Sequence, residues 1–400
     1  MTPSAAVDGN GERLRVFGSL CLLVFLVNFG RIVFAPLLDP FMGTFGVGEA
    51  TVGMIATLAW LGSALPRLPT GYLLMYVDRH QVVLGTGLLL AASAAFTATA
   101  ESVLQVAVGA FFMGSSSGAY FIAANPLVSE LFPNRVGRMI GIHGTASQLA
   151  AVVAPLSIGL VIAVSTWRSI FWILSGVAVL GTLGLYVAAR RATLPDVQAN
   201  ERHLLQSVRN QWPIVVTGVA IIGATGFVWN GFFNFYVSYL TATKGIPLGT
   251  AQSLLTVIFA AGVPAFWYTG KLADRVPHVS LMLSILIAFL VTLLVLTVVE
   301  SLVAVVIVSV VLGYVIHSLF PALDTYLLDN LPDTDRSSAY AAYSASMMLI
   351  QASASVVVGW LVQSGIPYDT VFRTFAGGLF VIFLVLFALR KADRLPNAAR

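Results

Sequence analysis

The chain has 400 residues, of which 58% are hydrophobic and only 10% are charged, and its mean hydropathy is +0.91. A soluble domain is ordinarily about 25% charged, and a soluble core of this size could not hide so much apolar surface. The composition therefore indicates an integral membrane protein. The formal net charge of +4 is small and its placement follows membrane topology, so we expect no nucleic-acid partner.

Residue types that would support enzymatic chemistry are sparse. The single cysteine, Cys21, lies within an apolar run, so the chain can form no internal disulfide and shows no metal-ligand spacing. It has no glycine-rich phosphate loop, and its short loops offer no nucleophile–base arrangement. We therefore expect no enzymatic activity, no metal, no cofactor and no use of ATP.

Twelve apolar runs follow one another along the chain, each about as long as the roughly 20 residues that a helix needs to span a bilayer. The residues before the first run, 1–13, are polar and are expected to be disordered. Most connections are only a few residues long, whereas the stretch 190–212 is longer and charged. The predicted spans are 16–40, 50–76, 81–100, 102–127, 139–163, 168–189, 213–240, 249–270, 279–298, 301–328, 337–362 and 370–389.

The placement of Lys and Arg predicts the orientation of these spans. With the N-terminus in the cytoplasm, seventeen basic residues lie on the cytoplasmic side and three lie in outer loops, as the positive-inside rule requires. The sequence thus predicts a multi-pass protein of the cell membrane with both termini cytoplasmic. Its expected parts are an N-terminal tail (1–15), a six-helix bundle (16–189), a linker (190–212), a second six-helix bundle (213–390) and a C-terminal tail (391–400).

The two halves match each other at a nearly constant offset. Because each half has an even number of spans, both have the same orientation, as in parallel repeats related by an axis along the membrane normal. Transporters of this kind bind substrate between the repeats and rock one half against the other. The offset is 199 for Thr51 and Thr250, Gly114 and Gly313, and Pro133 and Pro332, and it becomes 201 for Gly176 and Gly377.

Three short motifs resemble those of one family. Residues 270–275 read Gly-Lys-Leu-Ala-Asp-Arg, 133–138 read Pro-Asn-Arg-Val-Gly-Arg, and 167–171 read Trp-Arg-Ser-Ile-Phe. The first, which opens with Gly270, resembles the loop signature of the major facilitator superfamily between helices 8 and 9. The other two resemble stretches of that superfamily that lead into helix 5 and open helix 6.

The resemblance implies an all-α membrane protein with twelve transmembrane helices in two six-helix bundles, and a secondary transporter that works by alternating access. Two signatures of proton-coupled members and antiporters are weak in this chain. The helix 4 stretch 109–114 has no arginine, and the glycine–proline signature of helix 5 is reduced to 154–159. A drug/proton antiporter is therefore less favoured.

A charged patch, 270–278, is predicted to form a tight loop at the membrane surface. The resemblance implies that Asp274 caps a helix of the other half, here helix 5, which the chain enters through Arg138. Such a contact would join the halves on the cytoplasmic side and favour the outward-open state. Arg275 could pair with Asp329 at the end of helix 10. The alternative is that these are solvated loop charges, which contribute little.

The corresponding positions of the first half depart from the motif. Met75 stands where the second half has its acid, and Asp78 and Arg79 follow three residues later. This pair could take over the gating role, and Arg79 could pair with Glu130. We therefore expect asymmetric gates, with the stronger cytoplasmic latch in the second half.

Arg31 is the most informative residue for the substrate. It lies about 15 residues into the first span, in an apolar stretch that also holds Asn28. A charge there costs about 2.5–3.5 kcal/mol on insertion scales unless it faces water or a partner, and arginine suits the recognition of carboxylate or phosphate. Its repeat partner is Asn230, so the cavity between helices 1 and 7 is expected to have a positive bias. The alternative is a structural arginine paired with backbone carbonyls or with Asp39.

Other candidate substrate contacts are aromatic or polar side chains within the spans. Trp229, Asn234, Tyr120 and Tyr314 are plausible cavity-lining residues, although packing or an interfacial aromatic belt would explain many of them. His317, in the middle of helix 10, is a candidate proton carrier, and a packing histidine is the alternative.

His143 lies only a turn into helix 5 and is expected at the membrane interface. Together these features predict a membrane transporter of a small solute, with a preference for an organic or inorganic anion. Its expected partners are the solute, the lipid bilayer and a coupling proton or ion, and we expect a monomer. The alternatives are efflux of amphipathic compounds, suggested by the aromatic-rich helix 7, and a transporter-like sensor without flux.

Overall fold

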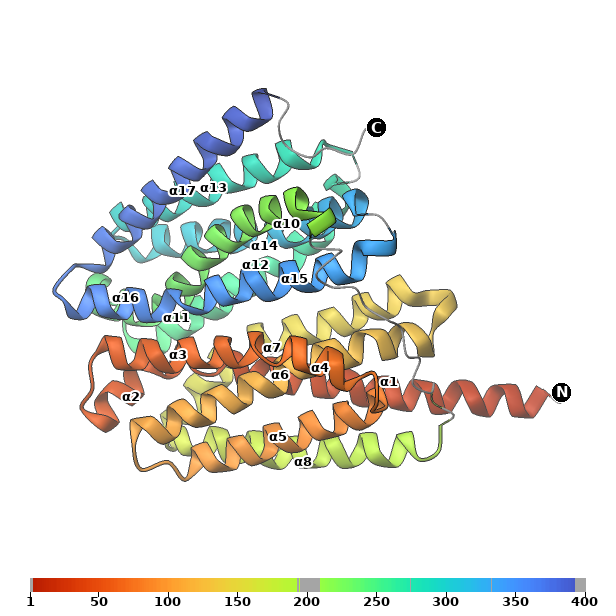
Figure 1. Cartoon of the computed structure of the whole chain (residues 1–400). Coiled ribbons are helices and arrows are strands. Elements are labelled where there is room, and N and C mark those ends of the chain that lie inside the picture. Colours follow the sequence, from red (N-terminus) through yellow and green to blue (C-terminus); the bar gives the residue numbers. More distant parts are fainter. Residues whose placement is uncertain (1–2, 193, 195–208, 274, 332, 393–400) are drawn as a thin grey trace. The chain divides into compact units, whose positions relative to one another are not determined.

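A computed structural model describes residues 3–192, 194, 209–273, 275–331 and 333–392 of the chain (Figure 1). Within these ranges the secondary structure is helical and contains no strand. The all-α fold class expected from the composition and the apolar runs is therefore confirmed.

The chain divides into two compact units. Unit 1 comprises Met1–Phe45 and Leu58–Glu201, and unit 2 comprises Gly46–Thr57 and Arg202–Arg400. The boundary falls within helix α3 (Glu49–Ala64). The other helices of unit 1 are α1 (Pro3–Ile32), η1 (Ala35–Leu37), α2 (Leu38–Phe45), α4 (Arg67–Leu73), α5 (Arg79–Ala98), α6 (Val103–Leu131), η2 (Pro133–Arg135), α7 (Val136–Val164) and α8 (Trp167–Ala189).

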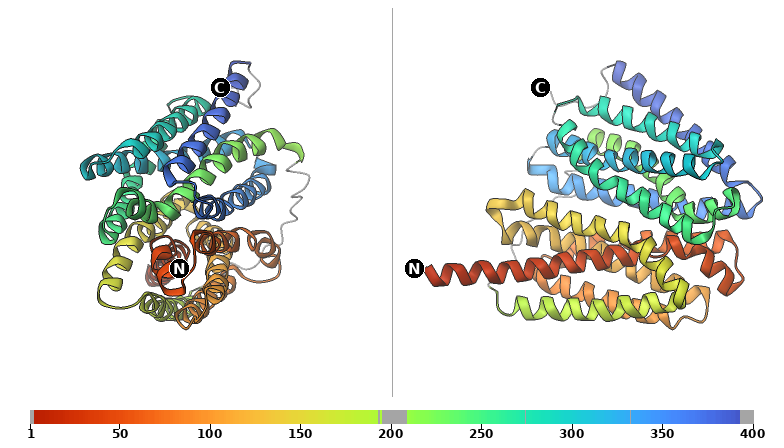
Figure 2. Two further views of the ribbon diagram at one scale, coloured as in Figure 1. Left: turned by 90° about the vertical axis from the view of Figure 1, so that its left-hand side faces the viewer. Right: turned by 180° about the vertical axis from the view of Figure 1, so that it is seen from behind.

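Unit 2 repeats this pattern of long helices joined by short connections (Figure 2). Its helix 7 is built from three consecutive segments, α10, η3 and α11, of which η3 is a π-helix. A π-helical turn has a wider hydrogen-bond spacing than the α-helix around it. The helices are α10 (Trp212–Gly218), η3 (Val219–Gly223), α11 (Ala224–Lys244), α12 (Leu248–Ala273), α13 (His278–Val298), α14 (Leu302–Asn330), α15 (Asp333–Ala352), α16 (Ala354–Gln363) and α17 (Tyr368–Lys391).

Eleven helices of the described chain are long and apolar enough to span a membrane. They correspond to eleven of the twelve predicted runs. The remaining run, 50–76, is helical but consists of two helices, α3 and α4, because the first helix stops before Pro66. Proline has no N–H to donate and its ring clashes with the preceding turn, so it breaks a helix interior.

Two sequence predictions about helix ends are wrong. Helix α1 already begins at Pro3, so the described part of the segment expected to be disordered is helical. A proline is tolerated in the first turn of a helix, where its missing N–H would have no partner. Helix α12 continues to Ala273, so Gly270 belongs to its last turn and the predicted loop 270–278 is shorter.

Helix 1 also ends earlier than predicted. Instead of running to residue 40, α1 ends at Ile32, and the chain continues through the short η1 into α2. The change of path coincides with Pro36, since it cannot donate the hydrogen bond that would continue the helix. Arg31 therefore lies in the last turn of α1 and not in the middle of a longer helix.

The repeat is visible in one backbone-to-backbone helix crossing. In unit 1, a Cβ atom added at Gly114 would lie 2.0 Å from the carbonyl oxygen of Ala59. In unit 2, a Cβ atom added at Gly313 would lie 2.2 Å from the carbonyl oxygen of Ile258. Both members of the second pair are 199 positions beyond their counterparts in the first. Small residues let membrane helices approach this closely, so the same crossing occurs once in each half of the sequence.

The first half of α3 belongs to unit 2 because it packs against α16. The backbone N–H of Val356 donates to the hydroxyl of Thr57 at 3.0 Å. A Cβ atom at Gly53 would lie 2.4 Å from the carbonyl oxygen of Ser355, and one at Gly359 would lie 2.3 Å from that of Glu49. These glycines again permit direct contact between helix backbones.

Candidate functional site

Arg31 is held from two sides within unit 1. Its Nη2 donates a hydrogen bond of 2.6 Å to Oδ1 of Asn28, one turn earlier in α1. The amide nitrogen of Asn28 donates in turn to the backbone carbonyl of Ser147 in α7, also at 2.6 Å. Because α7 fixes the orientation of the amide, the acceptor presented to Arg31 is a neutral oxygen. The guanidinium therefore keeps its full positive charge.

Helix α3 supplies the second side of this site. The guanidinium carbon of Arg31 lies 4.4 Å from the centre of the Trp60 ring, which is cation–π geometry. Trp60, Ser63 and Arg67 are spaced by three and four residues and share one face at the end of α3 and the start of α4. Nε of Arg67 donates to the carbonyl oxygen of Ser63 at 3.2 Å, and the charge of Arg67 repels that of Arg31.

Two polar atoms of this group lack a hydrogen-bond partner among the described residues. They are Nε of Arg31 and the hydroxyl oxygen of Ser63, and both are buried. Within the described chain Arg31 also forms no ion pair. A buried donor without an acceptor is unfavourable by about 1–3 kcal/mol, and more when it is charged. Nε of Arg31 can therefore donate a hydrogen bond to a further acceptor.

The helix end adds to this electrostatic picture. The last carbonyl groups of α1 form the negative end of the helix dipole, which favours a cation in the last turn. Arg31 occupies that turn, so the fold itself lowers the cost of keeping the charge in a membrane-spanning segment. The alternative of a purely structural arginine would use these carbonyls alone and would need neither Asn28 nor Trp60.

Tyr120 lies outside this group. Its side chain is completely buried, and its hydroxyl donates to the carbonyl of Leu20 at 2.6 Å. The same oxygen lies 3.0 Å from Nε2 of His143. Since the single hydroxyl proton goes to the carbonyl, the histidine Nε2–H is the donor. These contacts tie α6 to α1 and α7, which supports a packing role.

His143 is buried between α7 and α6, with only 1% of its surface exposed. Helix α7 begins at Val136, so His143 lies two turns into the helix and faces Tyr120. Its expected depth near the membrane interface stays a prediction. Its ring stacks on that of Tyr120 with 5.8 Å between centres.

In unit 2, Asn230 and Asn234 form a polar cluster with Ser355. The amide nitrogen of Asn234 lies 2.9 Å from Oδ1 of Asn230 and 3.1 Å from the hydroxyl of Ser355. Ser355 also donates to Oδ1 of Asn230 at 3.2 Å. Nδ2 of Asn230, by contrast, is buried and has no hydrogen-bond partner among the residues described. This amide is free to donate to a ligand.

His317 is enclosed by aromatic rings. The centre of its ring lies 5.5 Å from that of Trp229 and 5.7 Å from that of Phe259. Nδ1 lies 2.7 Å from the carbonyl oxygen of Gly313 and must donate, because a carbonyl can only accept. The geometry favours the packing histidine over the proton carrier. Tyr314, three residues earlier on α14, is 38% exposed and is not part of this cluster.

Of the predicted gating contacts, the described residues contain the pair between Arg79 and Glu130. Nη2 of Arg79 lies 3.1 Å from Oε1 of Glu130 and links α5 to α6. The backbone carbonyl of Asp78 accepts the first hydrogen bonds of α5. Since all three residues belong to unit 1, the pair itself stabilises that unit.

The remaining gating residues give less information. Arg138 and Arg275 are exposed, at the start of α7 and just after α12. Asp274 lies outside the described residues, and so does the side chain of Asp329, whereas Gly270 is part of the last turn of α12. Their proposed roles stay predictions.

A sequence model of the Major Facilitator Superfamily matches residues 20–308 and 219–400. The chain belongs to the major facilitator superfamily. Its helical fold, the repeated glycine crossing and the connections between helices agree with this membership. Proteins of this superfamily are membrane transporters rather than enzymes, so the coarse function predicted from the sequence is confirmed.

Two relatives in this superfamily are transporters. The uncharacterized transporter YgaY of Escherichia coli O157:H7 is 28% identical over 152 residues, which cover 38% of this chain and 38% of YgaY. The purine ribonucleoside efflux pump NepI of Salmonella paratyphi B is 24% identical over 235 residues, which cover 58% of this chain and 57% of NepI. The matches thus span less than two thirds of either relative.

Solved structures of superfamily members show the same fold. A bacterial homologue of the human lysosomal transporter Spinster, in an inward-facing conformation, has a TM-score of 0.79 at 15% identity and covers 94% of this chain and 96% of its own. The D-xylose–proton symporter has a TM-score of 0.76 at 14% identity, with 94% and 97% covered. At such identities the likeness concerns the fold alone.

Sequence reasoning found Arg31 and Asn28 but missed their neighbours Trp60, Ser63 and Arg67. Arg67 is one of the seventeen basic residues that the sequence places on the cytoplasmic side, and it was given no other role. The signal that could have found them is their common helix face, at positions i, i+3 and i+7 within an apolar run. What the sequence could not give is that this face meets the last turn of α1.

Proposed function

We propose that this superfamily member is a secondary transporter that moves a small organic or inorganic anion by alternating access, and that Arg31 contacts the anion. One observation carries the proposal. Arg31 has a neutral acceptor, an aromatic neighbour and a buried Nε without a partner among the described residues. A site built to bury and orient an arginine in this way suits a bidentate acceptor such as a carboxylate.

Electrostatics supports an anion over a cation. Two unit charges of opposite sign that lie about 4 Å apart attract each other by about 4 kcal/mol at an effective dielectric constant near 20. Arg67 adds a second positive charge, which lies close enough to Arg31 to repel its guanidinium group. An anion would relieve the repulsion between the two, whereas a cation would increase it.

The wider mechanism follows the sequence predictions. We propose that the bundles 16–189 and 213–390 are the two moving bodies, that both termini are cytoplasmic, and that the driving force is a gradient of the solute or of protons. The crossings at Gly114 and Gly313 support rigid bodies, because backbone-to-backbone packing leaves little freedom for helices to shift. For 16–189 to move as one body, the contact of the first half of α3 with α16 has to break during the cycle.

The proposal is tested on purified protein with a ligand-stabilisation screen. Succinate, benzoate, ribose 5-phosphate and nitrate represent anions, adenosine represents neutral heteroaromatic solutes, and a cationic dye represents amphipathic cations. A ligand that binds the folded protein raises its thermal stability in proportion to RT ln(1 + [L]/Kd). We expect stabilisation by at least one of the anions in the wild type.

Arg31→Gln is the decisive variant, and Arg168→Gln is its matched control. Arg168 also lies over a tryptophan, at 4.3 Å from Trp167, and also donates to an oxygen, at 2.8 Å from Ala100. Loss of charged hydrogen bonds worth about 1.5–3 kcal/mol corresponds to a roughly 10- to 150-fold rise in Kd for the anion. Stabilisation of Arg31→Gln by the same anion, equal to that of the control, would refute the role of Arg31.

A second candidate function is the export of a neutral heteroaromatic solute. The observation that favours it is the buried amide of Asn230 in unit 2, whose Nδ2 has no hydrogen-bond partner among the described residues. An unpaired donor of this kind suits an acceptor atom of a flat heteroaromatic base. The partial relative NepI is a purine ribonucleoside efflux pump. Stabilisation by adenosine that is lost in Asn230→Leu, but not in Arg31→Gln, would favour this function.

A further inference from the structure

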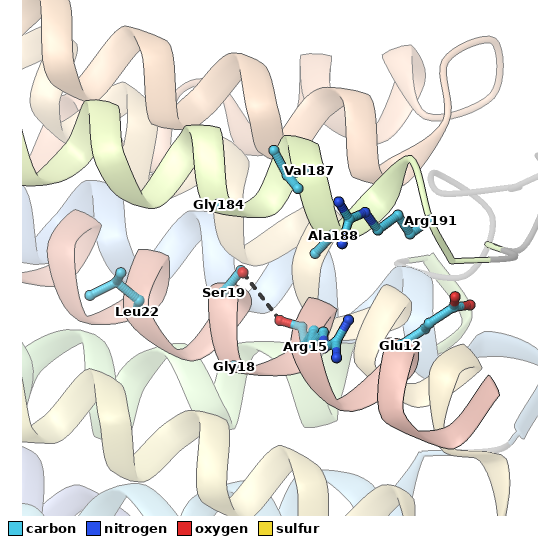
Figure 3. Close-up of a pocket in the computed structure, with 9 residues that line it drawn as sticks. All are labelled: Glu12, Arg15, Gly18, Ser19, Leu22, Gly184, Val187, Ala188 and Arg191. Atoms are coloured by element: carbon cyan, nitrogen blue, oxygen red, sulfur yellow. Dashed lines mark hydrogen bonds between the residues drawn. The ribbon is translucent and has the colours of Figure 1, made fainter. Parts of the chain in front are cut away.

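A cavity of about 420 Å³ lies between α1 and α8, away from Arg31 and from the polar cluster of unit 2. Figure 3 shows that its charged side chains gather toward one end of the two helices, while Leu22 lies at the other end. The charged residues are Glu12 and Arg15 on α1 and Arg191 just after α8. The cavity is thus amphipathic along the helix axes.

The position of the cavity along the two helices corresponds to the surface region of a bilayer. The apolar spans of the two helices are Gly11–Ile32 and Trp167–Ala189, so the arginines lie at the ends of both spans. Leu22 is seven residues beyond Arg15, about 10 Å deeper at 1.5 Å per residue. It is also 41% exposed, on a surface that would face the acyl chains. The charged end therefore lies at headgroup depth and the apolar end at the depth of the chains.

The charge of the cavity favours an anion at its polar end. Arg15 and Arg191 are exposed, and within the described chain neither guanidinium forms an ion pair or donates a hydrogen bond. One carboxylate against two guanidinium groups leaves a net positive charge on the lining residues. The carboxylate of Glu12 can accept hydrogen bonds from hydroxyl groups of a headgroup, while the arginines meet its phosphate.

Glycines keep the cavity open. A Cβ atom at Gly18 would meet nothing within 4 Å, and one at Gly184 would meet only the hydroxyl of Ser19 at 3.9 Å. Close packing of the helices therefore does not require glycine at these two positions. The two glycines leave room that a ligand can fill.

A second, apolar cavity of about 220 Å³ lies further along the same two helices and is also lined by α7. On α1 its lining includes Leu26 and Phe29, which follow Leu22 at helical spacing. On α8 it includes Ile173 and Val177, on the face that leads to Gly184. From Arg15 to Phe29 the helix rises about 21 Å, whereas one leaflet of the hydrocarbon core is about 15 Å thick. A phosphate at one end and an acyl chain toward the other fit this span.

We propose that the groove between α1 and α8 binds an anionic phospholipid from the leaflet on the side of the N-terminus, with its phosphate between Arg15 and Arg191. The site is independent of the transported solute, so it stands or falls separately from the proposed function. Basic pockets between membrane helices at the bilayer surface are suited to anionic headgroups.

The test measures lipid binding to the purified full-length protein by native mass spectrometry. Phosphatidylglycerol and phosphatidylcholine of the same chain length are titrated in separate experiments, and the Kd of the first bound lipid is compared. Each arginine near a membrane surface contributes a factor of about five to the affinity for an anionic lipid. We therefore expect the double variant Arg15→Gln/Arg191→Gln to bind phosphatidylglycerol about 25-fold more weakly than the wild type.

Two single variants separate the groove from general surface charge. Gly18→Leu fills the cavity without removing charge and should weaken phosphatidylglycerol binding, because its side chain enters open space. Arg190→Gln removes a neighbouring arginine that lies over Tyr186 instead of lining the cavity, and should bind phosphatidylglycerol like the wild type.

Three results would overturn the proposal. The first is equal affinity of the wild type for phosphatidylglycerol and phosphatidylcholine. The second is a loss in Arg190→Gln as large as that in the double variant. The third is displacement of the lipid by millimolar inorganic phosphate, which would assign the arginines to a free anion instead of a headgroup.

Discussion

We predict that Gly114→Ala and Gly313→Ala each destabilise the protein strongly. The new methyl group would lie 2.0 or 2.2 Å from a carbonyl oxygen of the facing helix, whereas ordinary contact begins near 3.4 Å. Each pair of helices must therefore separate by more than about 1 Å, which loses the dispersion contacts along the crossing. Overpacking of this kind costs about 1–3 kcal/mol.

The sequence supplies matched controls in the same two halves. Gly176 and Gly377 are also helical and correspond to each other in the repeat, but a Cβ atom at either position would meet nothing within 4 Å. Alanine in place of glycine in a helix stabilises it by about 0.5–1 kcal/mol because the unfolded chain loses freedom. The two types of substitution should thus differ by about 1.5–4 kcal/mol and have opposite signs.

The assay is reversible unfolding in detergent micelles with increasing sodium dodecyl sulfate, followed by the fluorescence of the seven tryptophans. The expected order of stability is the two control variants, then the wild type, then the two crossing variants. Equal stability of all four variants would refute the steric argument. A large loss for Gly114→Ala with none for Gly313→Ala would refute the equivalence of the two crossings.

Asn28→Asp should abolish anion binding, because a carboxylate 2.6 Å from Arg31 would neutralise its charge, and thermal shifts with the anion panel would measure this. Tyr120→Phe should lower the free energy of unfolding by about 1–3 kcal/mol, because the carbonyl of Leu20 and Nε2 of His143 lose their hydrogen-bond partner. The Kd of the anion should stay unchanged. A double-mutant cycle of Arg79→Gln and Glu130→Gln should give a coupling energy of at least about 0.5 kcal/mol in the unfolding assay.

Each of these three outcomes has a contrary result. Retained anion binding in Asn28→Asp would show that Arg31 is not the counter-charge. A weakened Kd in Tyr120→Phe at unchanged stability would restore Tyr120 as a substrate contact. A coupling energy near zero would show that the ion pair between α5 and α6 contributes nothing to the stability of unit 1.

Much of the fold could be predicted because hydropathy and repetition act over long stretches. Runs of about 20 apolar residues predict spanning helices regardless of detail. The offset of 199 between Gly114 and Gly313 predicted that the halves repeat, and the facing carbonyl groups have the same offset. The errors lie at helix ends, where prolines such as Pro36 and Pro66 outweigh the apolar pattern.

The candidate site was only partly predictable for a different physical reason. A charge in an apolar run stands out in the sequence, so Arg31 was found. Trp60 and Ser63 look like ordinary residues of an apolar helix, and only the packing of α3 against the last turn of α1 gives them a role. The contact of His143 with Tyr120 was not predicted either, because distance along a helix does not indicate which face is covered by another helix.

The π-helical segment η3 has a consequence for how helix 7 could have arisen and how it could be altered. A single extra residue in an α-helix is commonly accommodated as such a bulge. One residue corresponds to a rotation of about 100° in an α-helix. A π-helical turn absorbs this rotation, so deleting one residue from Val219–Gly223 would return the segment to regular α-helix while α10 keeps its orientation relative to the face that carries Asn230. The segment is thus a position at which helix 7 can gain or lose one residue without rotating either of its ends.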